Sequence, residues 1–225
     1  MLALKLGLSL VSTPILGKWM PDDESSLEAW YQYREGITLN GTDVERWDDQ
    51  STNSVDMAQG VAGKQPAYSN GVLTFVSSAR DFLQASEQIS LSGEFTIGIK
   101  ISPVLGASGT FLGDNTDSGE RFKINDDDTL LIAIGGSSKN FDLDSGTWGD
   151  DYLVITRDSS DLISLWKNGV LQADSETLAG TSLIDAISVR FNNVDNFDGT
   201  IEEIQIYSST SSDLTANIND RLSNL

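Results

Sequence analysis

The chain has 225 residues, enough for one sizeable domain or two small ones, and 39% of them are hydrophobic. It has no cysteine and no histidine, which excludes a disulfide framework, zinc sites built on those ligands, and Ser-His-Asp or Cys-His catalysis. Thirty-four acidic against 14 basic residues give a formal charge of −20, so nucleic acid and anionic membranes are poor partners. The acidic residues are spread along the chain, as expected for a solvated surface. The alternative interpretation is that some of them bind a cation.

The N-terminal segment, 1–20, is apolar but interrupted by Ser, Thr and Pro. It is too short to span a membrane. It shows no clear small-residue cleavage site and Met1 is retained, so we do not expect a cleaved secretory signal. A polar break at 21–26 divides the chain into a hydrophobic arm or edge segment, 1–24, and a main domain, 25–225. We favour an arm that docks on a neighbouring chain; an ordinary edge strand of the same domain is the alternative.

Alternating apolar residues predict strands along most of the main domain. Residues 26–34 place Leu27, Ala29 and Tyr31 on one face. Residues 95–101 place Phe and Ile at every second position, which predicts an inward face. Short strands at regular spacing, separated by turn residues, indicate an all-β sandwich.

The stretch 148–170 reads as a β-meander. Two runs rich in Leu, Val, Ile and Thr, 152–157 and 162–167, are separated by Asp and Ser residues that favour a turn. Asn168 and Gly169 then tolerate the positive φ angles that a tight hairpin needs.

The end of the domain shows three further elements. Residues 186–191 place Ile187, Val189 and Phe191 on one face of a predicted strand. Residues 197–207 form another strand. A Ser-rich stretch then provides an N-cap for a final helix whose stripe is Leu214, Ile218 and Leu222, predicted to act as a C-terminal clamp.

Two of these segments resemble a known family. A Trp, a strand ending in Thr156-Arg157-Asp158 and a strand running into Asn168-Gly169-Val170 are similar to the centre of laminin-G-like domains. The segment 197–207, F-D-G-T-I-E-E-I-Q-I-Y, is similar to their closing strand. These domains belong to the concanavalin A-like lectin/glucanase superfamily. The resemblance implies a jelly-roll β-sandwich of two antiparallel sheets with a short C-terminal helix.

The N-terminal half resembles concanavalin A-like proteins of tailed, marine or cyanophage-like bacteriophage virions. The shared layout is a Trp-x-Asp-Gln-Ser segment at residue 47, then Gln65-Pro66 before Asn70-Gly71. Thr52 stands where the family usually has Gly, and Phe75-Val76-Ser77 replaces a Phe-Asp-Gly element, which weakens transfer of a ligand site.

The carboxylates expected of the superfamily's hydrolases are not arranged for catalysis. Retaining glycoside hydrolysis needs two carboxyls about 5 Å apart. The acidic pair on the matching strand is Glu202 and Glu203, and adjacent strand residues point to opposite faces. Glu203 is predicted to face outward with Gln205. We therefore expect no enzymatic activity.

Calcium is the metal that the oxygen-rich turns favour, and the resemblance implies a site at the sandwich rim. The predicted calcium ligands are Asp114, Asn115, Asp117, Asp195 and Asp198. The turn at 126–128 is a further candidate. None of these stretches matches an EF-hand loop, and plain Asx turns are the default interpretation.

Sugar recognition needs an aromatic platform beside polar groups. Trp47, followed by Asp48 and Gln50, is the best loop candidate, whereas Trp148 and Trp166 lie in strand patterns and are expected to pack in the core.

The resemblance implies a non-enzymatic virion structural protein, made in the host cytoplasm, that decorates the capsid or belongs to a tail or fibre at the particle surface. Its partners would be other virion proteins or copies of itself, bound through the arm. The alternative is a lectin module for host-surface glycans, with calcium as an optional ligand.

Overall fold

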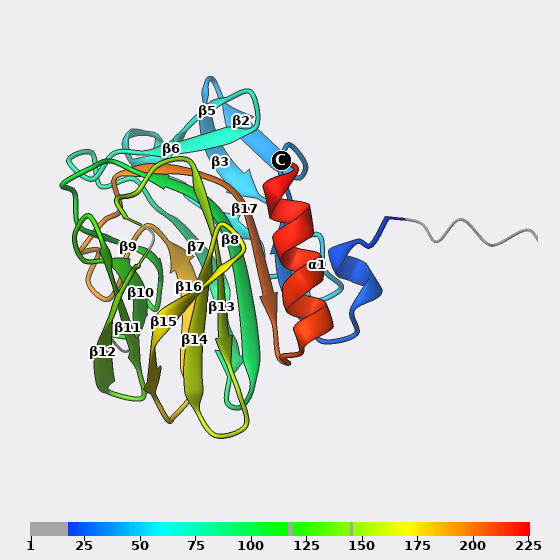
Figure 1. Ribbon diagram of the computed structural model, residues 1–225. Coiled ribbons are helices and arrows are strands. Elements are labelled where there is room, and N and C mark those ends of the chain that lie inside the picture. The colour runs from blue at the N-terminus through cyan, green and yellow to red at the C-terminus, as the bar shows by residue number, and fades with distance from the viewer. Residues whose placement is uncertain (1–17, 117–118, 145) are drawn as a thin grey trace, which may run out of the picture.

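The computed structural model describes residues 18–116, 119–144 and 146–225. In that part of the chain, nearly all regular structure is β, and the strands form two antiparallel sheets packed face to face with one α-helix outside them (Figure 1). The prediction of an all-β jelly-roll sandwich with a short C-terminal helix is confirmed. The hydrophobic arm falls mostly on residues 1–17, which lie outside the described residues.

The first sheet lies beneath the helix and is called the helix-side sheet. Hydrogen bonding sets its order as β1, β17, β8, β13, β14, β15. Its strands are β1 (Leu27–Tyr31), β17 (Gly199–Tyr207), β8 (Phe95–Pro103), β13 (Asp151–Arg157), β14 (Leu162–Lys167) and β15 (Val170–Thr177).

The second sheet forms the opposite layer, in the order β2, β3, β4, β7, β16, β9, β10, β11, β12. Its strands are β2 (Ile37–Asn40), β3 (Asp43–Trp47), β4 (Met57–Ala58), β7 (Leu83–Leu91), β16 (Ser182–Ile187), β9 (Gly109–Gly113), β10 (Arg121–Ile124), β11 (Thr129–Ile134) and β12 (Ser137–Asp142). Two short strands connect the layers, because β5 (Ala67–Ser69) pairs with β3 and β6 (Val72–Phe75) pairs with β17.

The core lies between the two sheets. The inward residues of β8 are fully or almost fully buried, as the alternation at 95–101 predicts. Phe95, the first of them, belongs to an aromatic cluster in which Phe122 of β10 contacts Phe95 and Phe111 at ring-centroid distances of 6.2 and 6.3 Å. Burial of such side chains is the main favourable term in folding.

The central meander has the predicted form. Asp158 Oδ1 accepts hydrogen bonds from the backbone N–H groups of Ser160 and Leu162, which closes the first turn. Asn168 and Gly169 have φ angles of 52° and 77°, so the β14–β15 hairpin uses the left-handed conformation that these two residue types tolerate.

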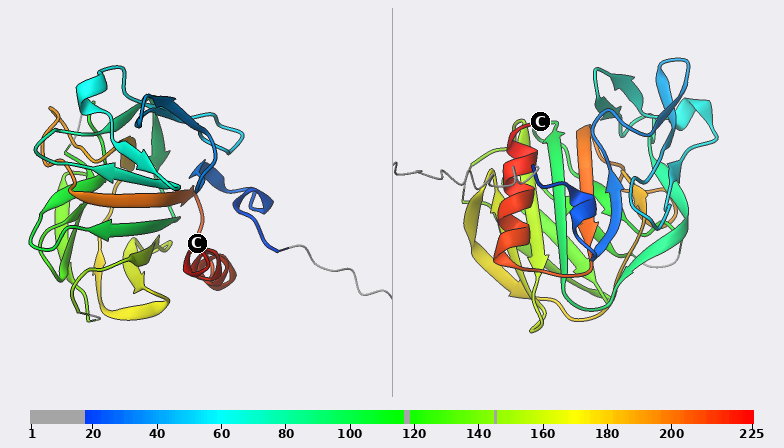
Figure 2. Two further views of the ribbon diagram at one scale, coloured as in Figure 1. Left: turned by 90° about the horizontal axis from the view of Figure 1, so that it is seen from above. Right: turned by 90° about the vertical axis from the view of Figure 1, so that its right-hand side faces the viewer.

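The C-terminal helix α1 (Ser212–Ser223) packs along the outer face of the helix-side sheet, as Figure 2 shows. Ser211 caps its N-terminus by accepting a hydrogen bond from the Leu214 N–H at 3.0 Å. Leu214, Ile218 and Leu222 are buried against Val154 and neighbouring strand residues, so the predicted clamp is confirmed.

The N-terminal end of the described chain also lies beside α1. Trp19 packs at the edge of the cluster beneath the helix, and the short 3-10 helix η1 (Pro21–Asp23) leads into β1. A second 3-10 helix, η2 (Ala62–Lys64), precedes β5. Within the described residues, no helix is long and apolar enough to cross a membrane.

Two strand predictions need correction. The strand expected at 186–191 ends at Ile187, because Ser188 has a φ of 72° and this left-handed residue breaks the alternation. Phe191 is therefore 38% exposed rather than inward. In β17, the register shifts between Ile201 and Glu203, and Ile201 and Ile204 both belong to the core. This β-bulge places Glu202 and Glu203 together between two inward residues, so strict alternation does not apply to that pair.

Candidate functional site

A groove of about 700 Å³ runs between the start of α1 and the β14–β15 hairpin, on the outer face of the helix-side sheet. Its lining consists of one aromatic residue and small or polar ones: Trp166, Gly169, Thr210, Ser211, Ser212, Thr215, Ala216 and Asn219. The groove is thus formed by two parts of the chain that are more than forty residues apart in sequence. It is a candidate ligand site of ordinary size for a small molecule.

The indole of Trp166 reaches the groove because of the alternation in β14. Ile163, Leu165 and Lys167 are buried on the inner side of the strand, so Trp166 lies on the outer side. It stands opposite Val154 of β13 and Leu171 of β15. Trp166 packs at the edge of the apolar cluster under α1 but stays partly exposed. The expectation that Trp166 belongs to the core is therefore only half correct.

The helix side of the groove is polar. Asn219 Nδ2 donates to the Thr215 carbonyl oxygen at 2.9 Å. Asn219 Oδ1 is buried and accepts no hydrogen bond from the described residues. The hydroxyl groups of Thr210 and Ser212 also line this wall. An acceptor without a partner costs free energy when it is desolvated.

The apolar surface continues past the groove along β15. Val170 is 58% and Leu171 is 57% exposed, although both belong to a regular strand. Leu171 stands opposite Trp166 in the β14–β15 pair and extends the apolar surface on that face, whereas Val170 stands opposite the inward Lys167. An aromatic face next to hydroxyl and amide groups is the combination that sugar rings require, because their C–H faces are apolar and their edges form hydrogen bonds.

The sequence pointed instead to Trp47, which is not available as an exposed platform. Trp47 is the last residue of β3, is fully buried, and packs against Tyr31 at a ring-centroid distance of 5.7 Å. Its Nε1–H donates to the carbonyl oxygens of Gln32 and Glu35, each at 3.2 Å. The Trp47 ring is thus part of the hydrophobic core.

The polar neighbours of Trp47 have local partners. The Asp48 carboxylate pairs with Arg46, and Gln50 Nε2 donates to the Asp48 carbonyl oxygen at 3.0 Å. These two side chains are partly exposed at the end of β3 and line no common pocket with Trp166. A ligand role for Asp48 and Gln50 stays a prediction.

The first group of predicted calcium ligands lies at the end of β9. Asp114 is fully buried, and its Oδ1 accepts from Gln88 Nε2 at 3.0 Å and from the Thr116 N–H at 2.9 Å. Asn115 Oδ1 accepts from the Asn193 N–H at 3.0 Å. The oxygens are thus already engaged by protein donors. Asp117 lies outside the described residues.

Asp195 and Asp198, the second group, are not brought together with the first. Asp195 Oδ2 pairs with Arg190 Nε at 2.6 Å and with Lys123 Nζ at 3.6 Å. Asp198 Oδ2 accepts from the Ser77 hydroxyl at 2.9 Å. Among the described residues there is no group of three or more acidic side chains placed to hold a metal ion. Calcium binding by these residues stays a prediction.

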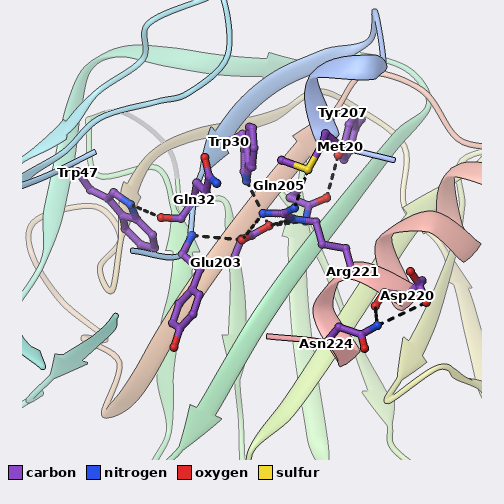
Figure 3. Close-up of polar contacts among 11 residues, drawn as sticks. Met20, Trp30, Gln32, Trp47, Glu203, Gln205, Tyr207, Asp220, Arg221 and Asn224 are labelled. Carbon is purple, nitrogen blue, oxygen red and sulfur yellow. Dashed lines mark hydrogen bonds and ion pairs between the residues drawn. The ribbon is translucent and has the colours of Figure 1, made fainter. Parts of the chain in front are cut away.

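Glu203 lies off the core side of β17, as predicted, but α1 covers it and it is fully buried (Figure 3). Its carboxylate pairs with both Nε and Nη2 of Arg221 and accepts from Trp30 Nε1 at 3.2 Å and from the Tyr33 N–H at 3.2 Å. The Arg221 guanidinium lies 4.9 Å from the centre of the Trp30 ring. This cluster attaches the helix to the sheet.

The same contacts remove Glu203 from consideration as a catalytic acid or base, because its charge is neutralised and solvent is excluded. Burial raises the pKa of Glu202, and Asp150 raises it further against Lys100 and Arg34. A carboxyl with a raised pKa is one half of a hydrolytic pair. The adjacent Glu203 does not form such a pair with Glu202, because it is committed to Arg221.

Comparison with known proteins gives a likeness in fold alone. No protein-family model matches the sequence, and no curated protein matches it. The binding domain of Paraclostridial Mosquitocidal Protein 1 superposes with a TM-score of 0.54 at 14% identity, over 91% of this chain and 53% of that one. The botulinum neurotoxin serotype C1 binding domain gives 0.55 at 14% identity, over 92% and 53%.

An enzyme is also among the similar structures. Trypanosoma rangeli sialidase, in complex with sialic acid, gives a TM-score of 0.55 at 14% identity, over 89% of this chain and 33% of that one. The chain therefore spans about half of the toxin domains and a third of the sialidase. These neighbours support a β-sandwich of jelly-roll type; a concanavalin A-like or bacteriophage relationship stays a prediction.

Proposed function

We propose that this protein is a non-catalytic carbohydrate-binding module that holds a saccharide in the groove between α1 and the β14–β15 hairpin. The observation that carries the proposal is the partly exposed indole of Trp166 facing the hydroxyl and amide groups of Thr210, Ser212 and Asn219. The sugar ring would stack on the indole, and its hydroxyls would exchange hydrogen bonds with the helix wall.

Two of the similar structures support this choice of ligand class. A botulinum neurotoxin binding domain of type DC, with a TM-score of 0.52 at 16% identity, was solved in complex with SialylT. The sialidase was solved with sialic acid. Both cases concern larger proteins, and they make a saccharide the first ligand class to test.

The test is a glycan array probed with the full chain, with and without calcium, followed by calorimetry with the best-bound saccharide. Trp166→Ala is expected to weaken binding at least about fivefold, since a stacked aromatic contributes roughly 1 kcal/mol beyond area burial. Ala216→Arg is a second variant that fills the groove from α1 with a good helix former.

Phe191→Ala is the matched control, because Phe191 is an exposed aromatic residue that follows β16 of the second sheet. The proposal fails if no saccharide binds, or if Trp166→Ala and Ala216→Arg both bind like the unmodified chain. It also fails if calcium removal abolishes binding while Trp166→Ala does not, because the site would then lie at the acidic loops.

A structural role in a bacteriophage particle is a second proposal, and it rests on the sequence resemblance and on the apolar arm. The arm would join the protein to other virion proteins or to its own copies at the particle surface. Trp19, near its end, packs beside α1, so the described end of this segment lies on the helix-covered face. Deletion of residues 1–17 is expected to abolish particle association in a co-sedimentation assay. If the shortened chain still associates, the arm has no such role.

A further inference from the structure

Three cationic side chains gather on the outer face of the second sheet of a strongly acidic protein. Arg121 and Lys123 lie two residues apart in β10, with Phe122 and Ile124 facing the core between and beyond them. Arg190 follows β16 and reaches the same place. The chain has only 14 basic residues against 34 acidic ones, so three in one cluster is a marked local reversal of charge.

We call Arg121, Lys123 and Arg190 the cationic cluster. One carboxylate, that of Asp195, pairs with two of its members. Asp195 Oδ2 lies 2.6 Å from Arg190 Nε and 3.6 Å from Lys123 Nζ. Burial alone would raise the pKa of Asp195, but the Arg190 hydrogen bond and the charges of the three cations hold it below its usual value. Asp195 is therefore ionised at neutral pH, and the cluster retains two net positive charges.

The fold brings the two guanidinium groups together by means of two glycines. Gly113 stands across from Arg121 in the β9–β10 pair, and a Cβ there would lie 3.3 Å from Cβ of Arg190. A Cβ on Gly119 would lie 3.6 Å from Nη1 of Arg121 and 3.9 Å from Nη1 of Arg190. Both Nη1 atoms thus border the same small space.

Arg121 lacks an acidic partner in the part of the chain that the structure describes. Nη1 donates to the Gly119 carbonyl oxygen at 2.7 Å, and Nε is buried without an acceptor. Burial and the charge of Arg190 lower the pKa of Arg121, and the charge of Asp195 offsets part of this shift. Buried donors normally have a partner, and an anionic oxygen beside this guanidinium would supply a charge-assisted one.

A pocket of about 200 Å³ adjoins Arg121. Ser137 and Ser138 of β12 provide hydroxyl groups at its edge, and Ala133 provides an apolar floor. Glu120 also lines the pocket, but its carboxylate accepts hydrogen bonds from the backbone N–H groups of Gly135 and Leu183. The space suits one small ring rather than a polymer.

The loop that carries Asp195 is held in an unusual conformation. Asn192, Asn193 and Asp195 have φ angles of 64°, 55° and 56°. Asn193 is fixed by hydrogen bonds with Asn115 at 3.0 and 3.1 Å. Left-handed backbone of this kind persists only where neighbouring contacts hold it, and here it directs Asp195 toward Arg190.

We propose that the cationic cluster binds the oxyanion of a small acidic saccharide, either a carboxylate or a sulfate group. Arg121 and Arg190 would bind its oxygens, and the pocket beside Arg121 would hold the sugar ring. The charge of −20 disfavours approach to polyanionic surfaces, whereas one small monoanion meets only the local positive field. This site lies on the sheet opposite the Trp166 groove, so the two sites are independent.

The experiment is calorimetry of the full chain with sodium glucuronate and with sodium sulfate, at ionic strength held constant with sodium chloride. Glucose is the neutral counterpart of glucuronate. Glucuronate and sulfate are expected to bind and glucose is not. Binding of glucuronate but not sulfate would assign the site to carboxylates, and the reverse would assign it to sulfate groups.

Arg121→Gln and Arg190→Gln are expected to weaken anion binding roughly tenfold to hundredfold, as for loss of hydrogen bonds to a charged group. Lys139→Gln is the matched control, because it removes the same charge from an exposed pair with Glu176. Arg121→Lys keeps the charge but loses the planar guanidinium and its paired N–H donors, and it is expected to weaken anion binding as well.

The proposal is overturned if neither anion binds the unmodified chain. It is equally overturned if Arg121→Gln binds the anions as tightly as Lys139→Gln does, because any effect would then come from the lower positive charge of the protein and not from this site. If Arg121→Gln or Arg190→Gln does not fold, shown by loss of the unfolding transition, Arg121→Lys decides: unchanged affinity in that variant contradicts recognition by the guanidinium.

Discussion

Arg221 joins the C-terminal helix to the helix-side sheet through the buried carboxylate of Glu203. Replacement by Met keeps much of the packing over Trp30 but leaves an unpaired buried charge. We expect Arg221→Met to lower the free energy of unfolding by about 3–5 kcal/mol, measured by urea denaturation.

The double variant Glu203→Gln/Arg221→Met provides the control. It removes both charges, and the Gln oxygen can still accept from Trp30 Nε1. It is expected to be more stable than Arg221→Met alone. Equal instability of the two variants would show that packing, and not the buried charge, dominates at this position.

Asp81 makes stability depend on pH. Burial raises the pKa of its carboxyl, which the Val76 N–H hydrogen bond only partly offsets, so the folded protein holds this proton at higher pH than the unfolded chain does. Above the unfolded pKa of about 3.9, the folded state therefore holds more protons than the unfolded chain. The free energy of unfolding falls as pH rises through that window.

Asp81→Asn retains an oxygen for the Val76 N–H and cannot ionise. We expect its free energy of unfolding to fall less than that of the unmodified chain between about pH 4 and about pH 7. Urea denaturation at both pH values measures this. Parallel pH dependences would show that Asp81 does not contribute.

At the scale of elements, α1 depends on a glycine in the strand beneath it. A Cβ on Gly98 of β8 would overlap Cγ2 of Ile218. We expect Gly98→Ala to destabilise the fold by about 1–3 kcal/mol through displacement of α1, and to weaken saccharide binding because α1 forms one wall of the groove. Thermal unfolding and calorimetry measure the two effects.

Gly60→Ala serves as the control for Gly98→Ala. A Cβ at Gly60 would meet no atom within 4 Å, and its φ angle is not positive. Alanine there is expected to leave binding unchanged and stability unchanged or slightly higher. If both variants behave alike, α1 tolerates the displacement and the groove does not depend on the position of the helix.

Much of this architecture is predictable from sequence because local chemistry determines it. Asn168 and Gly169 determine the hairpin, and Ser211 with the stripe of α1 determines the helix. Tertiary effects account for the failures. The left-handed Ser188 ends a strand that alternation would continue, and the bulge before Glu203 changes which residues share a face.

The candidate site was harder to predict for the same reason. Trp47 has polar neighbours in sequence, but the core buries its ring. Trp166 sits in a strand pattern that indicates burial, but α1 covers only part of it. The groove joins β14 to residues 210–219, and a sequence shows no signal for contacts between such distant elements.

At the scale of the whole molecule, the sandwich presents two chemically different faces. The helix-side sheet carries the apolar and hydroxyl-lined groove, and the second sheet carries the cationic cluster. The surrounding charge of −20 disfavours approach to polyanions, most strongly at low salt. On our two proposals, each face binds its own small ligand independently of the other.

The five tryptophans offer the most direct measurement of the central claim, because each indole N–H gives its own signal in a nitrogen-15 correlation spectrum. Titration with the best saccharide from the array is expected to move the Trp166 signal and the amide signals of residues 210–219. The signals of the buried Trp47 and Trp148 should stay in place. Movement confined to other residues, with Trp166 unchanged, would contradict a sugar site in this groove.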